Sequence, residues 1–131
     1  MNEQAAHGEP KYIRVSDTDN VVVVCFMDLD GLEMGEYEKL AEELQGIVER
    51  REGMSMILDF EGKGFIPWAA LEAVLVRLHR KLDSKLRMCK LPPNVIHHFE
   101  MNRLLDIFHI YATREEALAT TKVFMEFSSQ R

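Results

Sequence analysis

The chain has 131 residues, of which 47% are hydrophobic and 29% are charged, and its formal net charge is −6 at pH 7. This size and composition predict one globular domain around one core. Nucleic-acid binding requires clustered cations, so we expect no nucleic-acid partner. The longest apolar run, Val21 to Met27, is too short to cross a bilayer, and the polar start does not resemble a signal peptide. We therefore expect a cytoplasmic protein without a membrane partner.

The first 27 residues predict a short lead-in followed by a β-hairpin. Residues 1–10 are polar and are expected to be disordered, so the domain is predicted to span residues 11–131. Strands are predicted over residues 11–17 and 21–27, with a turn over residues 18–20, where Thr, Asp and Asn favour local side-chain hydrogen bonds. The four consecutive valines of the second strand predict burial on both faces.

Helical and strand patterns alternate in the middle of the chain. Apolar residues recur at spacings of three and four over residues 33–51, which predicts an amphipathic helix that stops at Gly53. Residues 54–60 predict a strand. Pro67 is expected at the first position of the next helix, whose apolar face continues to Leu82.

The remaining sequence continues the alternation. A strand is predicted over residues 85–91, a helix from the Pro-Pro-Asn at residues 92–94 to about Leu105, and a short strand over residues 108–111. Thr113 and Glu116 have the spacing of a capping box at the start of a closing helix. The order predicts an α/β fold: a mixed sheet, opened by an antiparallel hairpin and continued by parallel strands, with about four helices.

The apolar run that ends in Asp28-Leu29-Asp30 also resembles the nucleophile strand of haloacid-dehalogenase-type phosphatases, in which the first Asp is the nucleophile. That mechanism requires a lysine and a distal acidic pair for magnesium, and only Asp59 follows the third predicted strand. A calcium loop that starts at Asp28 would need Glu at its twelfth position, where Lys39 stands. We therefore expect no enzymatic activity and no cofactor.

Three segments, in this order and spacing, resemble motifs of the STAS domain, the fold of bacterial anti-sigma-factor antagonists. They are Asp28-Leu29-Asp30 before the first helix, "MILDFEGKGFI" at residues 56–66, and "LPPNVIHHFEMNRLLDIFHIYATREEAL" at residues 91–118. The resemblance covers about residues 11–119. It implies a non-enzymatic regulator of bacterial transcription that binds an anti-sigma factor, which in this family is also a kinase.

The sequence departs from the family pattern after Phe65-Ile66. Antagonists of the family carry Asp-Ser-Ser-Gly-Leu there, and the kinase phosphorylates the first Ser. Here Pro67 replaces the Asp, Trp68 the phosphorylated Ser, and Ala69 the second Ser. No hydroxyl remains, so we expect no phosphorylation switch at this position. The protein would either bind its partner constitutively or act as a scaffold or sensor subunit through self-association.

Several residues are candidates for partner binding, and each also has a structural explanation. Trp68 is either an interface anchor or a space-filling residue that folds onto the loop at residues 61–64. The two aspartates before the first helix either contact a partner or complement the helix dipole. The candidate partner-binding residues are Asp28, Asp30, Gly62, Pro67, Trp68 and Ala69.

The remaining reactive and apolar residues suggest no further chemistry. Cys25 and Cys89 are expected to be small buried residues, and a disulfide would require neighbouring strands. The histidines at positions 97, 98 and 109 do not have metal-ligand spacing, so we expect no metal site. Aromatic residues 124 and 127, with Met125, are expected to dock on the domain or to form a homodimer patch.

Overall fold

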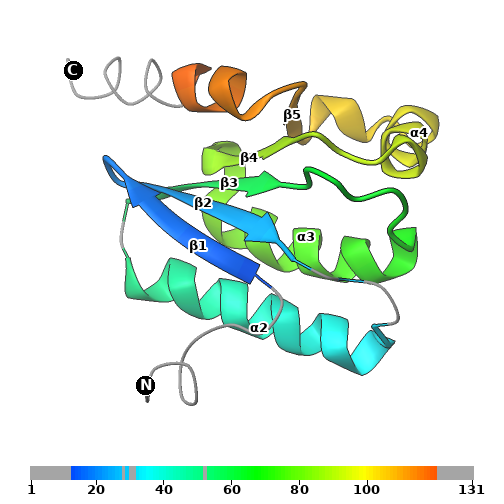
Figure 1. Cartoon of the computed structure of the whole chain (residues 1–131), viewed down its shortest axis with the longest axis horizontal. Coiled ribbons are helices and arrows are strands. Elements are labelled where there is room, and N and C mark those ends of the chain that lie inside the picture. The colour runs from blue at the N-terminus through cyan, green and yellow to red at the C-terminus, as the bar shows by residue number, and fades with distance from the viewer. Residues whose placement is uncertain (1–12, 28, 30–31, 52, 121–131) are drawn as a thin grey trace.

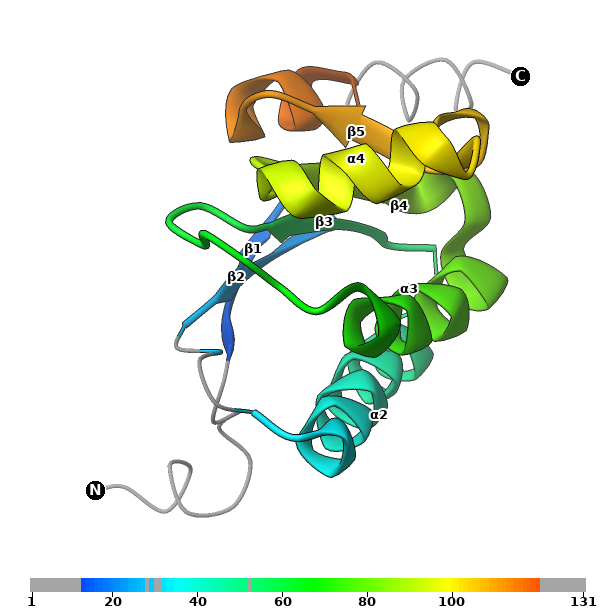
Figure 2. The ribbon, with the colours of Figure 1, turned by 90° about the vertical axis from the view of Figure 1, so that its right-hand side faces the viewer.

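Figures 1 and 2 show a computed structural model of the chain, which describes residues 13–27, 29, 32–51 and 53–120. A five-stranded sheet in the order β1-β2-β3-β4-β5 forms the centre of the domain. The strands and helices are β1 (Ile13–Thr18), β2 (Val21–Phe26), α2 (Met34–Arg50), β3 (Ser55–Asp59), α3 (Trp68–Leu82), β4 (Leu86–Cys89), α4 (Pro93–Met101) and β5 (His109–Tyr111), with 3₁₀ turns η1 (Asp83–Lys85) and η2 (Leu104–Asp106). Residues 114–120 are also helical.

The predicted hairpin and the mixed sheet are confirmed. β1 pairs antiparallel with β2, and Thr18 lies opposite Val21. The two residues between them, Asp19 and Asn20, both have positive φ angles (49° and 65°), which a two-residue hairpin turn of type I′ requires. All later pairs, from β2 to β5, are parallel.

One face of the sheet is covered by α2 and α3, which lie side by side in Figures 1 and 2. The even-numbered valines of β2, Val22 and Val24, point into this main core, and Val95 and Phe99 of α4 join it. The predicted helix periodicity is confirmed, because the buried residues of α2 include Tyr37, Leu40, Leu44 and Ile47.

The opposite face of the sheet carries a smaller core. Val21 and Val23 of β2 point to this side and pack with Ala117 and Leu118 of the last helix. Strand β2 therefore buries both of its faces, as its run of valines predicts. Phe124, Met125 and Phe127, for which docking or a dimer patch is predicted, lie outside the described residues, as do residues 1–10.

Two predicted helix boundaries are wrong. Pro67 is not the first helical residue but the N-cap of α3: its ψ is 125°, and its carbonyl accepts the first helical hydrogen bond from the Leu71 N–H. The helix predicted to reach Leu105 ends at Met101, because Arg103 adopts a left-handed conformation with φ 57°. The Asn102 side chain donates to the His98 carbonyl (2.9 Å) and so satisfies a terminal backbone acceptor.

None of the helices in the described part of the chain is long and apolar enough to cross a membrane.

The capping box predicted before the last helix is present and yields a stability test. The Glu116 N–H donates to Thr113 Oγ1 (3.1 Å), and the Thr113 N–H donates to Glu116 Oε1 (3.3 Å). We expect Thr113→Ala to lower the free energy of unfolding by about 1 kcal/mol, measured by urea denaturation. Thr113→Ser keeps the hydroxyl and is expected to retain most of the stability. Equal losses in both variants would contradict a capping role.

Candidate partner-binding site

The candidate site lies where the parallel strands end. The carboxyl ends of β2, β3 and β4 lie at one edge of the sheet, and the helices that follow them begin there (Figure 1). The predicted site residues Gly62, Pro67, Trp68 and Ala69 all belong to the connection from β3 to α3 or to its first turn. Asp28 and Asp30, which follow β2, lie outside the described residues, so their partner-binding role stays a prediction.

A tight turn begins the connection from β3 to α3. The Lys63 N–H donates to the Phe60 carbonyl (3.0 Å), and Gly62, the third residue of the turn, has a φ of 82°. This backbone angle is the one that a type II turn requires at that position and that glycine adopts without strain. Gly62 therefore shapes the loop, and its exposed position leaves its backbone open to a partner.

Asn94 at the start of α4 holds the end of the same connection. Its side-chain amide donates to the Ile66 carbonyl (2.7 Å) and accepts from the Ile66 N–H (3.4 Å). Ile66 is buried in the main core. The backbone immediately before Pro67 is thus fixed on one side by burial and on the other by α4.

Trp68 is half-buried and packs against α4. Its ring is stacked on His98, with centroids 5.2 Å apart and an interplanar angle of 10°, and meets Phe99 edge to face at 5.3 Å. The ring therefore fills space, against α4 rather than on the loop at residues 61–64, and it stays partly exposed. Its role as an interface anchor stays a prediction. Pro67 and Ala69, on either side of it, are exposed.

Further exposed apolar residues lie at this end of the sheet, and the sequence patterns did not single them out. Phe65, one residue before the buried Ile66, is 68% exposed. Met27 after β2 and Met34 at the start of α2 are also exposed and belong to the same edge of the sheet. Contiguous patches of exposed apolar side chains, rather than single ones, mark protein-binding sites. The apolar pair Phe65-Ile66 at the end of a polar loop was the available sequence signal.

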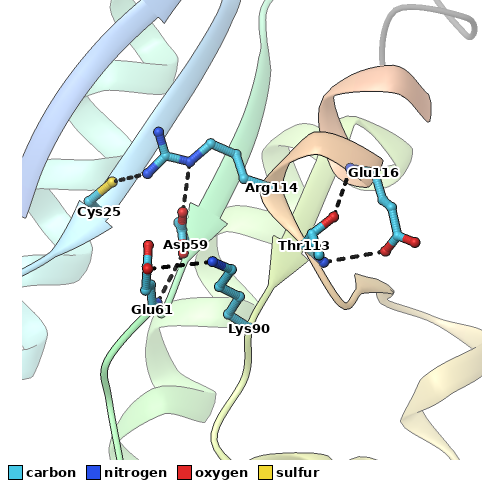
Figure 3. Close-up of polar contacts among 7 residues, drawn as sticks. All are labelled: Cys25, Asp59, Glu61, Lys90, Thr113, Arg114 and Glu116. Atoms are coloured by element: carbon cyan, nitrogen blue, oxygen red, sulfur yellow. Dashed lines mark hydrogen bonds and ion pairs between the residues drawn. The ribbon is translucent and has the colours of Figure 1, made fainter.

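A buried ion pair anchors the first residues of this connection to the last helix. Asp59, the last residue of β3, is 1% exposed, and its Oδ2 lies 2.8 Å from Nε of Arg114. Its other oxygen accepts a hydrogen bond from the Glu61 N–H at 2.9 Å (Figure 3). The hydrogen bond to Asp59 raises the pKa of the Arg114 guanidinium. The phosphatase interpretation considered Asp59 only as half of an incomplete acidic pair for magnesium, whereas the structure places it in an ion pair with Arg114.

The two cysteines flank Asp59 in one row across the sheet. Cys25 of β2 and Cys89 of β4 are its register partners on either side, so β3 separates the thiols and both are free. Cys89 is buried as predicted, and burial, with the nearby Asp59 charge, raises the pKa of its thiol to about 12. Cys25 is only half-buried, and its Sγ accepts a hydrogen bond from Nη2 of Arg114 (2.9 Å; Figure 3).

This edge of the sheet presents apolar surface to solvent. Its accessible apolar groups are an indole, a proline ring, a phenyl ring and two thioethers, which can bury surface against another protein. The ion pair of Glu61 and Lys90 adds exposed charge to the same edge. The titratable group at its centre, Asp59, is already engaged by two hydrogen bonds. Among the described residues, no group of three or more His, Cys, Asp or Glu is arranged to hold a metal ion.

Comparison with known proteins shows the family. Residues 12–117 match the model of the STAS domain, so the chain belongs to the STAS domain family, as its motifs predict. A putative anti-sigma factor antagonist, BtrV of Bordetella bronchiseptica, is 29% identical over 106 residues, which cover 79% of this chain and 89% of that protein.

Solved structures confirm the fold. An anti-sigma-factor antagonist (STAS) domain protein from Planctomyces limnophilus superposes with a TM-score of 0.67 at 20% identity, covering 84% of this chain and 97% of that one. The protein TM1081 superposes with a TM-score of 0.69 at 16% identity, and the match covers 88% of this chain and 93% of TM1081. The Bacillus cell fate determinant SpoIIAA in its phosphorylated form superposes with a TM-score of 0.60 at 21% identity. This match covers 82% of this chain and 97% of SpoIIAA.

The Asp59–Arg114 pair can be tested with a double-mutant cycle. Arg114→Ala leaves a buried carboxylate without its cation, and we expect a loss of about 2 kcal/mol in the free energy of unfolding, because Arg114 itself is partly exposed. Asp59→Asn keeps the acceptor for Glu61. The double variant is expected to lose at least about 1 kcal/mol less than the sum of the single variants.

The exposed pair Arg51–Asp17 provides the matched control for this cycle. The cycle of Arg51→Ala and Asp17→Asn is expected to give a coupling energy below about 1 kcal/mol, because both groups are solvated. Equal coupling energies in the two cycles would contradict a special role for the buried pair.

The two thiols are expected to react at different rates. With a disulfide reagent at about pH 8, the native protein should release one equivalent quickly, because Cys25 is partly accessible, whereas Cys89 is buried and its thiol stays protonated. Cys25→Ala should remove the fast phase and Cys89→Ala should keep it. A fast phase that survives Cys25→Ala would show that Cys89 is the accessible thiol.

Proposed function

We propose that this protein is a non-enzymatic regulator in the bacterial cytoplasm, which binds an anti-sigma factor or a related kinase-fold protein through the start of α3. Family membership and the similarity to a putative anti-sigma factor antagonist support this proposal. The observation that carries it is the exposed apolar surface that leads into α3, where Phe65 is accessible three residues before the ring of Trp68, which is stacked on His98. Rigid aromatic side chains of this kind are typical interface anchors.

We further propose that phosphorylation at the start of α3 does not switch this protein. Pro67, Trp68 and Ala69 carry no hydroxyl, and no Ser, Thr or Tyr occurs between Phe60 and Ser84. A phosphate near a helix N-terminus adds roughly −2 charge at neutral pH and would repel or block a partner there. Without an acceptor residue, partner binding through this surface is constitutive.

The binding test uses the purified full chain and a kinase-fold anti-sigma factor from the same genome. Phe65→Ala is expected to raise the Kd about tenfold or more, measured by titration calorimetry, because it removes an exposed aromatic anchor. Met101→Ala is the matched control: Met101 is also 68% exposed but lies at the far end of α4. Unchanged affinity of Phe65→Ala would exclude this surface as the binding site.

The absence of a switch is tested in the same mixture. With magnesium and ATP added, we expect the intact mass of the wild-type chain to stay unchanged and the complex to persist. Phosphorylation of any Ser or Thr that releases the partner would overturn constitutive binding. Failure to bind any kinase-fold protein would favour the second candidate, a scaffold or sensor subunit that acts through self-association.

A further inference from the structure

A groove of about 360 Å³ lies between α3 and the segment that follows α4. Its wall on one side is a face of α3, and its other wall comes from Leu104, Ile107 and Phe108. Val76 and Ile107 line it and are 41% and 47% exposed, although both are apolar. The described part of the chain does not cover this groove, so an apolar strip remains open to solvent along α3.

The α3 wall of the groove has a symmetrical charge pattern. Trp68, Glu72, Val76 and Arg80 follow one another at four-residue intervals and form one ridge, which we call the α3 ridge. Glu72 and Arg80 carry opposite charges at equal distances, about 6 Å along the helix axis, on either side of Val76.

Neither charge of the α3 ridge is neutralised by the part of the chain that the structure describes. No described residue forms an ion pair with Glu72 or Arg80. The adjacent Lys81, in contrast, faces α2 and pairs with Glu49 at 3.7 Å. The two unpaired charges are therefore available to an external partner with the complementary pattern.

That complementary pattern occurs in the α3 ridge itself. When a helix meets a second copy of itself in antiparallel orientation across a two-fold axis, each residue lies opposite the one equally far on the other side of the centre. With the axis at Val76, the two copies of Val76 meet, and each Glu72 lies opposite the Arg80 of the other copy. Ridges of residues four apart also pack well against one another in helix pairs.

We propose that the α3 ridge and its groove form the contact surface of a homodimer, with the α3 helices antiparallel and two Glu72–Arg80 pairs flanking the apolar centre. A 15-residue helix is about 22 Å long, so the contact is small and the dimer reversible. The symmetrical placement of Glu72 and Arg80 favours a second copy of this chain as the partner, because an identical antiparallel helix always presents the complementary charges. The inference does not depend on the proposed function, but because Trp68 belongs to both surfaces, self-association and partner binding would compete.

Charge reversal on the full chain tests this arrangement by sedimentation velocity over a range of concentrations. The wild type is expected to show a reversible monomer–dimer equilibrium. Glu72→Arg places two new arginines opposite Arg80, and Arg80→Glu places two new glutamates opposite Glu72. Each single variant is expected to raise the dimer dissociation constant about tenfold or more. Glu42→Arg, the same charge change at an exposed position of α2, is the control and should leave the dimer unchanged.

Recombining the variants identifies the pairing. A mixture of Glu72→Arg and Arg80→Glu is expected to form a heterodimer with near wild-type affinity, because both cross-pairs are again opposite in charge. The double variant Glu72→Arg/Arg80→Glu should likewise regain self-association. A wild type that stays monomeric, or a mixture that associates no better than the single variants, would overturn the proposal. Partner binding by calorimetry is a separate readout, so either proposal can fail alone.

Discussion

The structure depends on one buried carboxylate. Asp59 ends the central strand β3, and its two oxygens are engaged by the turn that leads to α3 and by Arg114 of the last helix. An unpaired carboxylate at this depth would be costly, so the pair requires the last helix to lie on the second face of the sheet. The last helix also supplies Ala117 to the smaller core, which buries the second faces of β2 and β3. Through Asp59, one ion pair thus links the position of the last helix on the sheet to the position of the turn that begins the candidate site.

Most of the fold could be predicted because its signals are local. The valines of β2, the periodicity of α2 and α3 and the capping box at Thr113 each reflect interactions within a few residues or with a general apolar environment. The two wrong boundaries arose where a backbone conformation decided the outcome, at Pro67 and at Arg103. Local patterns do not specify such single-residue angles.

The candidate site was predicted only in part because its contacts are long-range. The family motif located Trp68 and its neighbours, but not the α4 surface on which the ring is stacked. Asp59 and Arg114 are 55 residues apart, and Asn94 lies 28 residues after Ile66. Such pairs are determined by the topology of the sheet, and the family motifs that contain these residues do not show which of them are in contact.

The two hydrogen bonds between the Asn94 side chain and the Ile66 backbone affect which side chains the start of α3 can carry. The side-chain amide of Asn94 satisfies both backbone groups of Ile66, much as a neighbouring strand would, and it does so from another helix. The backbone path into α3 is therefore determined by Asn94 and by the burial of Ile66, and not by the three residues that follow Ile66. Those residues can exchange a small hydroxyl side chain for a large indole while the scaffold beneath them keeps its shape. The fold thus separates the backbone geometry of this segment from its side-chain chemistry, and one scaffold can carry side chains of different size and polarity there.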